Sequence, residues 1–267
     1  MVICAARHHL LRGSWARMWQ RPVSGRVYTE LDFDQEEIKA KLLGFPGGTI
    51  ELSKQESGIA VLTINNPSRM NAFSGSMMVQ LEEKDGMKMC MFMQNALTRL
   101  LRLPMISVAL VEGRAVGGGA ELTTACDFRL MAPGSVVQFV HKHLGVVPGW
   151  GGAARLVHLV GSQNSLKLLS GASKVDPEFG VQIRLADGVL KDPQVEEGVG
   201  TVLQQAEKWL CHYTTGPPSV IQAIKKVALS GRELPLVEAL RTEKQVFGTV
   251  WGGPANLQAL TSKSKYK

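Results

Sequence analysis

A triple-glycine turn, Gly117 to Gly119, is the feature that most constrains how this chain folds. It follows an apolar run, Met105 to Val111, that predicts a buried strand, and it precedes a run with helical periodicity. Because glycine has no Cβ, the main chain can approach a ligand closely here, and a helix start adds the positive end of its dipole. The pattern predicts a turn that binds an oxyanion or a phosphate. A tight turn or a close-packing contact is the alternative explanation of the same glycines.

Known phosphate-binding patterns fit this turn badly. No Lys-Ser or Lys-Thr pair follows the glycines, and the G-x-G-x-x-G spacing is absent. The formal net charge is +7, but residues 1–29 hold five arginines and no acid, so the rest of the chain carries 7 − 5 = +2. A basic arm is a weaker sign of nucleic-acid binding than a basic folded face, and we expect no nucleic-acid partner.

Apolar and helical runs alternate along the 267 residues, of which 45% are hydrophobic, enough for one substantial core. Strands are predicted at 49–53, 59–64, 106–111 and 128–131. Helices are predicted at 34–43, 76–84, 85–103, 120–126, 152–161 and beyond, 202–213 and 220–229. The first two strands are expected to form a hairpin. The order of the elements predicts an α/β fold with a parallel-sheet core.

The four cysteines, Cys4, Cys90, Cys126 and Cys211, are scattered and lack metal-ligand spacing. We expect reduced thiols, a reducing compartment inside the cell and no metal site. No apolar run approaches the ~18 residues of a membrane span, so no membrane partner is expected. Residues 1–29, rich in arginine and free of acids, are typical of a mitochondrial presequence.

Three motifs in a fixed order resemble the crotonase, or enoyl-CoA hydratase/isomerase, superfamily. They are LTINNPSRMNAF at 62–73, LPMISV at 103–108 and LGVVPGWGG at 144–152. The resemblance covers roughly Phe45 to Leu260. It implies an α/β fold with a crotonase-like ββα spiral core and a helical carboxy-terminal region. It also implies an acyl-CoA substrate, no separate cofactor, and a homo-oligomer, either a trimer or a hexamer.

The resemblance divides the chain into three expected parts. Residues 1–44 form a basic arm and a short helix, either disordered or used for targeting. Residues 45–215 form the crotonase-like core, shortened near 84–86, and residues 216–267 form the carboxy-terminal helical region. The members that the chain resembles most are expected in the cytosol, so we expect the cytosol here, with the mitochondrial matrix as the alternative.

One departure from the superfamily lies in the interval 72–103, which has the pattern of two helices. In the family this interval also holds a sheet strand and a glycine-containing loop that supplies the first of two oxyanion donors. A strand, a loop and the flanking helix ends occupy about 30 residues or more, so the interval is too short to contain them beside its helices. We interpret this as an internal deletion between Lys84 and Asp85, either a splice form or an imperfect gene model.

Other segments resemble the members that remove CO₂ from short branched malonyl-type CoA thioesters, such as ethylmalonyl-CoA and methylmalonyl-CoA. These segments are NPSRMNAFSG at 66–75, FVHK at 139–142 and VWGGPAN at 250–256. Decarboxylation produces an enolate, which N–H donors at the thioester oxygen stabilise. The resemblance implies Gly118 as one donor. Its partner belongs to the missing loop, so an impaired catalyst is expected.

Two side chains occupy the positions of the paired glutamates with which hydratases of the family add water. Glu121 matches the first position, and His141 replaces the second. His141 is expected to protonate the enolate or to pair with the leaving carboxylate, because its charge can switch near neutral pH. Structural roles are the alternatives: an acid favoured in the first turn of a helix for Glu121, and a hydrogen-bonded loop residue for His141.

The expected substrate-binding residues come from the same resemblance: Arg69, Met70, Ala72, Gly117 and Trp150. The turn that contains Arg69 is implied to hold the coenzyme A adenine and phosphates, and Trp150 is implied to form a wall of the acyl pocket, with core packing as its alternative. Two other functions remain open. The first is a hydratase or isomerase, a hypothesis that His141 disfavours because water addition needs paired carboxylates. The second is a non-catalytic acyl-CoA-binding homologue, which the missing loop favours.

Overall fold

The computed structural model describes residues 2–5, 40, 43–55, 59–66, 68, 73–77 and 86–261. A main sheet of six strands runs in the spatial order β2 (Thr49–Lys54), β3 (Ile59–Asn65), β1 (Val2–Ala5), β4 (Ile106–Val111), β6 (Phe128–Met131) and β9 (Gly188–Val189). A second sheet contains β5 (Arg114–Val116), β7 (Val136–Gln138) and β8 (Lys174–Val175).

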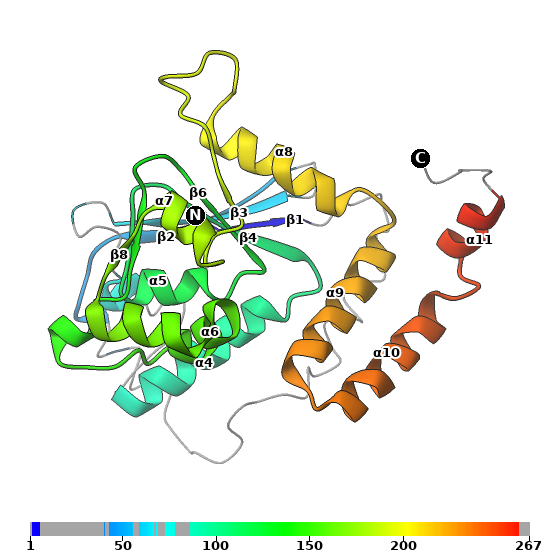
Figure 1. Cartoon of the computed structure of the whole chain (residues 1–267), viewed down its shortest axis with the longest axis horizontal. Coiled ribbons are helices and arrows are strands. Elements are labelled where there is room, and N and C mark those ends of the chain that lie inside the picture. Colours follow the sequence, from blue (N-terminus) through cyan, green and yellow to red (C-terminus); the bar gives the residue numbers. More distant parts are fainter. Residues whose placement is uncertain are drawn as a thin grey trace.

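Helices cover both faces of the main sheet (Figure 1). They are α4 (Gly86–Leu101), α5 (Gly118–Thr123), α6 (Gly152–Gly171), α7 (Pro177–Gln182), α8 (Val202–Thr214), α9 (Pro218–Glu233), α10 (Leu236–Val250) and α11 (Pro254–Thr261), with a 3₁₀ turn, η2 (His141–Leu144). This mixed architecture confirms the predicted α/β fold class with a helical carboxy-terminal region.

Strand β4 is buried on both faces. Successive side chains of a strand point in opposite directions, and each face of β4 packs against a different set of helices. Val108 and Leu110 pack under α8, in a cluster that also contains Leu210. Ala109 faces the other way and packs with Leu122 of α5 and the residues of α4. The apolar run that predicted this strand therefore has a structural cause: helices cover it above and below.

The predicted hairpin is confirmed, since β2 and β3 pair antiparallel from Thr49↔Asn65 to Lys54↔Ala60. The prediction of a parallel sheet holds for β4, β6 and β9 and is wrong for β2, β3 and β1. Strands β4, β6 and β9 run parallel, whereas β1 pairs antiparallel with both β3 and β4. The sheet is mixed because a hairpin always joins antiparallel strands, and because β1 enters from the distant amino-terminal segment.

Residues 2–5 belong to the segment that was expected to be a basic arm, and they form a strand inside the main sheet. Four residues are too few for a periodicity argument, and the arginines that follow dominate the composition of this segment. The expected helix at 34–43 lies almost entirely outside the described residues. The helix predicted at 85–103 is α4, and most of the one predicted at 76–84 is also outside the described residues.

Helix α9 is anchored to the sheet by a buried ion pair. Lys225 Nζ donates to Asp127 Oδ2 at 2.7 Å and to the carbonyl oxygen of Met105 at 2.6 Å. The same carboxylate oxygen accepts from the N–H and hydroxyl of Ser107 at the start of β4. Lys225 is therefore a structural cation that attaches α9 to the start of β4.

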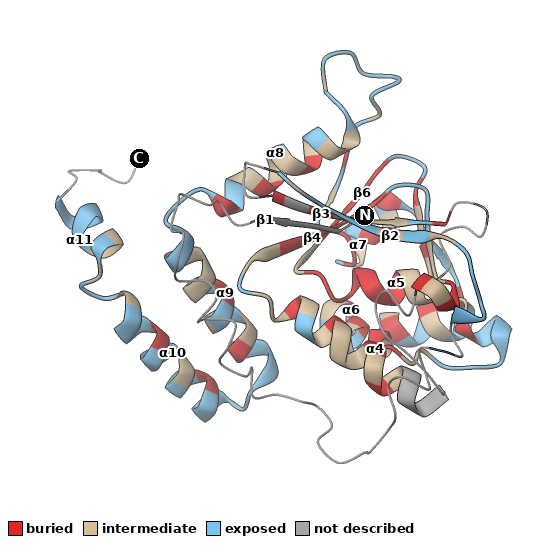
Figure 2. Ribbon diagram, turned by 180° about the vertical axis from the view of Figure 1, so that it is seen from behind, coloured by how far each residue is buried: buried red, intermediate tan, exposed pale blue. Residues whose placement is uncertain are grey.

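Helices α10 and α11 extend away from the sheets, with α10 packed along α9 (Figure 1). Much of their surface is exposed in the view from behind (Figure 2). The exposed side chains include seven large apolar residues: Leu236, Val237, Leu240, Phe247, Trp251, Leu257 and Leu260. A monomer rarely exposes so many apolar side chains on neighbouring elements, so this carboxy-terminal arm has the composition of a contact surface.

Candidate active site at the glycine turn

The candidate site begins where the chain leaves β5 and enters α5. Gly117 has φ 57° and ψ −120°, a conformation that residues with a Cβ rarely adopt. Its N–H donates to the carbonyl of Gln138 in β7 at 2.9 Å, and its carbonyl accepts from the N–H of Glu121. Gly117 is therefore required by its backbone angles, and its own N–H is already engaged by the neighbouring strand.

Gly118 has a different reason to be glycine, namely the Trp150 indole that lies against it. A Cβ added to Gly118 would lie 2.5 Å from ring atoms Cη2 and Cζ3 of Trp150. Trp150 is only 6% exposed and packs edge-on against Phe73, with ring centroids 5.1 Å apart. The indole thus belongs to the packed core and directly covers the first residue of α5.

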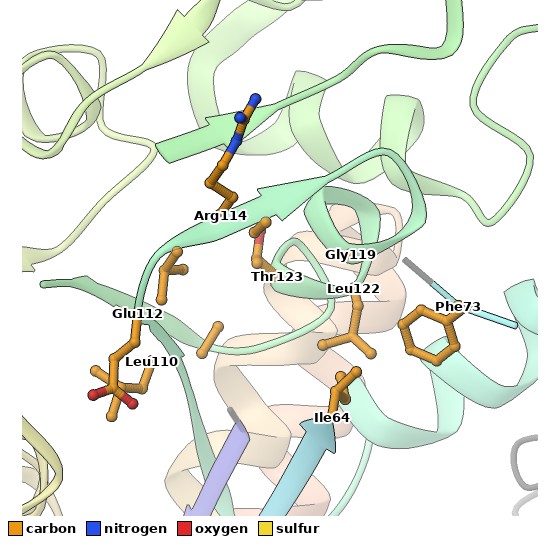
Figure 3. A pocket seen from close by; sticks show the side chains of 11 residues that line it. Ile64, Phe73, Leu110, Glu112, Arg114, Gly119, Leu122 and Thr123 are labelled. Atoms are coloured by element: carbon orange, nitrogen blue, oxygen red, sulfur yellow. The ribbon is translucent and has the colours of Figure 1, made fainter. Parts of the chain in front are cut away.

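Gly119 faces open space, and it lines a small cavity of about 50 Å³ (Figure 3). The cavity lies between β3, β4 and α5, and polar and apolar groups contribute about equally to its walls. The lining residues are Ile64, Phe73, Ala109, Leu110, Val111, Glu112, Arg114, Ala115, Gly119, Leu122 and Thr123. This volume has room for a few water molecules, and it is far smaller than the pockets that hold whole ligands.

Glu121 is the most heavily hydrogen-bonded acid of the site and is 1% exposed. Its Oε2 accepts from the backbone N–H groups of Trp150 at 2.9 Å and Gly152 at 2.8 Å. Its Oε1 lies 2.9 Å from Nε2 of His141. The side chain also packs so closely on Gly152 that an added Cβ there would lie 2.4 Å from Cγ of Glu121. Both carboxylate oxygens therefore already have partners.

His141 begins the 3₁₀ turn η2 and is 8% exposed. Because Oε1 of the Glu121 carboxylate can only accept, Nε2 of His141 carries the hydrogen of this bond. Its other ring nitrogen, Nδ1, is buried and has no hydrogen-bond partner within the described part of the chain. The hydrogen bond to Glu121 therefore orients the ring and leaves Nδ1 as its polar atom without a partner among the described residues.

Arg155 is a member of the site that sequence reasoning missed. Its Nη2 donates to the Trp150 carbonyl at 2.7 Å and its Nε donates to the Thr124 hydroxyl at 3.0 Å. Burial lowers the pKa of Arg155 to about 10, and the nearby charge of Glu121 opposes that shift. The guanidinium is therefore still charged at neutral pH and balances the buried carboxylate. An arginine four residues after a Gly-Trp-Gly turn gives no local signal of this role.

Cys90 of α4 lies against the same turn, since a Cβ added to Gly149 would lie 2.5 Å from its sulfur. Burial raises the pKa of the Cys90 thiol, and the charge of Glu121 raises it further. Gln94 of the same helix donates to the Gly149 carbonyl at 2.8 Å. Helix α4 therefore supports the turn that carries Trp150 through the contacts of Cys90 and Gln94 with Gly149. The neutral thiol of Cys90 suits this packed position.

The structure brings five of the expected site residues together: Gly117, Gly118, Glu121, His141 and Trp150. The other three, Arg69, Met70 and Ala72, lie outside the described residues. Phe73, which is described, contacts Trp150. Among the residues that the structure describes, no group of three or more His, Cys, Asp and Glu side chains is arranged to hold a metal ion.

The described helices include none that is long and apolar enough to cross a membrane.

Comparison with known proteins finds one matching family model and several similar proteins that share a name. The family model described as enoyl-CoA hydratase/isomerase matches residues 82–253. An ethylmalonyl-CoA decarboxylase of Danio rerio is 59% identical over 270 residues, covering 86% of this chain and 88% of the relative. The protein of the same name from Gallus gallus is 52% identical, covering 96% of this chain and 98% of the relative.

The alignment with the first of these relatives contains more positions than this chain fills, while the place of the expected deletion, between Lys84 and Asp85, stays a prediction. The alignment with the Danio rerio protein is 270 positions long but covers 86% of 267 residues, or about 230, so about 40 aligned positions have no residue in this chain. Unmatched positions on this scale fit the loss of a strand and its loop.

Solved structures show the fold independently. An enoyl-CoA hydratase from Thermoplasma volcanium superposes with a TM-score of 0.68 at 20% identity, covering 81% of this chain and 97% of that one. A Thermobifida fusca protein assigned to the same group and solved in complex with CoA gives a TM-score of 0.65 at 21% identity, with 82% and 96% covered. The predicted crotonase-like fold is confirmed.

Substitution of Glu121 tests the role of its carboxylate in the fold. Glu121→Ala leaves two backbone N–H groups and Nε2 of His141 without an acceptor, so we expect a loss of about 3 kcal/mol or more in urea unfolding. Glu121→Gln keeps an oxygen for the two N–H groups and is expected to cost less than half of that. Equal losses for the two variants would show that these hydrogen bonds do not hold the site together.

The contact between Gly118 and Trp150 predicts opposite results for two neighbouring glycines. Gly118→Ala is expected to destabilise the protein by about 1–3 kcal/mol and to change the Trp150 environment, because the methyl group overlaps the indole. Gly119→Ala, the matched control, has open space and is expected to be neutral or to stabilise by up to about 1 kcal/mol. Thermal unfolding followed by tryptophan fluorescence measures both, and a tolerated Gly118→Ala would contradict the packing.

Proposed function

Because the chain belongs to the enoyl-CoA hydratase/isomerase family, we propose that it removes CO₂ from short branched malonyl-type CoA thioesters, with ethylmalonyl-CoA and methylmalonyl-CoA as substrates. The names of its relatives in Danio rerio and Gallus gallus support this reaction. The observation that carries the proposal is the buried pair of His141 and Glu121, in which Nδ1 of His141 has no hydrogen-bond partner among the described residues.

The proposed reaction needs no oxidant and no separate cofactor. The bond between the α-carbon and the carboxylate carbon breaks and releases CO₂, and its electron pair moves through the α-carbon to the thioester oxygen, forming an enolate. A proton then adds to the α-carbon and gives the saturated acyl-CoA. The enzyme has to stabilise the negative oxygen and to supply one proton.

His141 is the proposed proton donor. The Glu121 carboxylate holds the ring through Nε2, so Nδ1 delivers the proton and is later reprotonated from water. Glu121 itself acts as a positioning residue, because both of its oxygens are occupied. A carboxylate that orients an imidazole and stabilises its charged form has the same role in the catalytic triads of hydrolases.

Gly118 is the proposed oxyanion donor, since the first N–H groups of a helix have no acceptor within that helix. The expected contacts of Arg69, Met70 and Ala72 with coenzyme A are part of the same proposal. So is the Trp150 wall of the acyl pocket, for which the apolar surroundings of the indole give support. In the structure this indole packs against Gly118 at the position that a Cβ would occupy, so the proposed wall and the proposed donor are adjacent.

Water addition fits the site less well than decarboxylation. A hydratase needs two carboxylates that exchange the roles of acid and base. Here one position holds His141, and the remaining Glu121 has no free oxygen.

A non-catalytic acyl-CoA binder is the second candidate function. It is favoured by the absence of about 40 aligned positions and by the position of the Trp150 indole on Gly118. Loss of one oxyanion donor typically lowers a rate about a hundredfold to a thousandfold. We propose that the second oxyanion donor belongs to the missing positions and that this chain therefore decarboxylates its substrate slowly.

Oligomerisation into a trimer or hexamer is proposed on separate grounds. The exposed apolar side chains of α10 and α11 would be covered by a neighbouring subunit.

The impaired activity is tested by restoring the missing segment. The aligned positions of the Danio rerio relative are inserted between Lys84 and Asp85, and butyryl-CoA formed from ethylmalonyl-CoA is followed by mass spectrometry. We expect kcat/KM to rise about a hundredfold or more over the natural chain, because a second oxyanion donor is regained. A folded insertion variant with unchanged turnover would contradict the proposal, and hydration of an enoyl-CoA would favour the hydratase.

The role of His141 is tested in the restored chain, where turnover is measurable. His141→Asn keeps a side-chain N–H for Glu121 but cannot carry the proton, so product formation is expected to fall about a hundredfold. His143→Ala, the matched control, changes an exposed histidine of the same turn and is expected to leave the rate unchanged. A rate for His141→Asn equal to that of His143→Ala would remove the catalytic role.

A further inference from the structure

The two halves of the main sheet are joined by β1. Within the strands that the structure describes, β3 pairs with β2 and β1, and β4 pairs with β1 and β6, so no backbone pairing joins β3 directly to β4. Each residue of Val2–Ala5 has a partner on both sides. The hairpin of β2 and β3 is therefore attached to the parallel strands through four residues from the distant amino-terminal segment.

The pairing of β1 ends close to the cavity beside the glycine turn. Val2 is in register with Leu62 of β3 and Ala109 of β4, and both strands continue beyond these residues. Ile64 of β3 and Leu110 and Val111 of β4 lie in this continuation and line the cavity, together with Gly119 of α5. A movement of β3 away from β4 would therefore enlarge the cavity next to the candidate site.

We propose that residues 2–5 act as a detachable strap, a short strand that closes the sheet between β3 and β4 and whose release opens the sheet beside the glycine turn. The strap has only four residues, so few ladder hydrogen bonds hold it. It is joined to β2 by 43 residues, 6–48, and closing such a long connection costs chain entropy. Segments with few contacts open at a lower free energy than the core of a protein.

Release of the strap is local because the α8 side of the sheet keeps its packing, so only the gap between β3 and β4 opens. Ile59 and Val61 of β3 pack in one buried cluster with Val108 and Leu110 of β4 under helix α8. Opening would leave unpaired N–H and C=O groups along the β3 and β4 edges facing the gap, and these groups would bind water or another extended chain. The occupant that we assign to the gap is the strap of the same molecule.

A covalent lock in the full-length chain tests this proposal. Cys4 is in register with Ala60 of β3, and paired residues on antiparallel strands have Cα atoms about 4.5–5.5 Å apart, within reach of a disulfide. Ala60→Cys is therefore expected to form an intramolecular disulfide with Cys4 on mild oxidation. Val61→Cys places a thiol on the opposite face of the strand and is expected not to link. Ala60→Cys with Cys4→Ser controls for the other cysteines.

Hydrogen exchange then separates a detachable strap from a permanently built-in strand. In the oxidised Ala60→Cys variant, the amides of residues 59–62 and 106–109 are expected to exchange at least tenfold more slowly than in its reduced form. In the otherwise natural chain, Ile3→Pro removes a ladder N–H and is expected to speed exchange of the same amides, whereas Ile3→Val, the conservative control, leaves it unchanged.

Four results would overturn the proposal. The first two are failure of Ala60→Cys to link and equally efficient linkage by Val61→Cys, since either shows that the strap does not occupy this register. A disulfide-linked dimer would assign the strand to a second copy of the chain. Exchange that is identical in the locked and reduced forms would show a strand that does not detach. The lock does not depend on whether Ile3→Pro folds.

Discussion

The buried carboxylate of Glu121 is the interaction on which the site depends. It accepts from the backbone N–H groups of Trp150 and Gly152, and it bonds to His141, so helix α5, the turn before α6 and the turn η2 all meet at one side chain. An isolated charge in the interior is very unfavourable. Three hydrogen bonds and the nearby guanidinium of Arg155 offset that cost, which makes the carboxylate a structural centre as much as a chemical one.

The glycine turn shows how one sequence pattern combines separate physical requirements. Gly117 is needed for a positive φ, Gly118 for the contact with the Trp150 indole, and Gly119 lies beside open space. The sequence left two explanations open, anion binding and close packing, and the structure gives direct evidence for packing at Gly118. Anion binding by the same turn remains our proposal, and it requires the indole and the thioester to share one region of the site.

The main sheet keeps its continuity although about 40 aligned positions of its relatives are missing. A gap in the middle of a sheet would leave two rows of backbone groups without partners, which is costly in a buried position. Here residues 2–5 supply the pairing between β3 and β4. The shortened interval still provides α4, whose small contacts with the turn at Gly149 support the candidate site from the other side.

Elements with local signals could be predicted from the amino-acid sequence. The periodicity predicted α4, the hairpin and the strands at 106–111 and 128–131, and the ordered motifs indicated the family, since each depends on neighbouring residues. The mixed sheet, the position of residues 2–5 and the hydrogen bonds of Glu121 became visible in the folded chain alone, since the partners of Glu121 are 20 to 31 residues away. Such contacts depend on how separate elements pack, and that packing leaves no periodic pattern in the sequence around either partner.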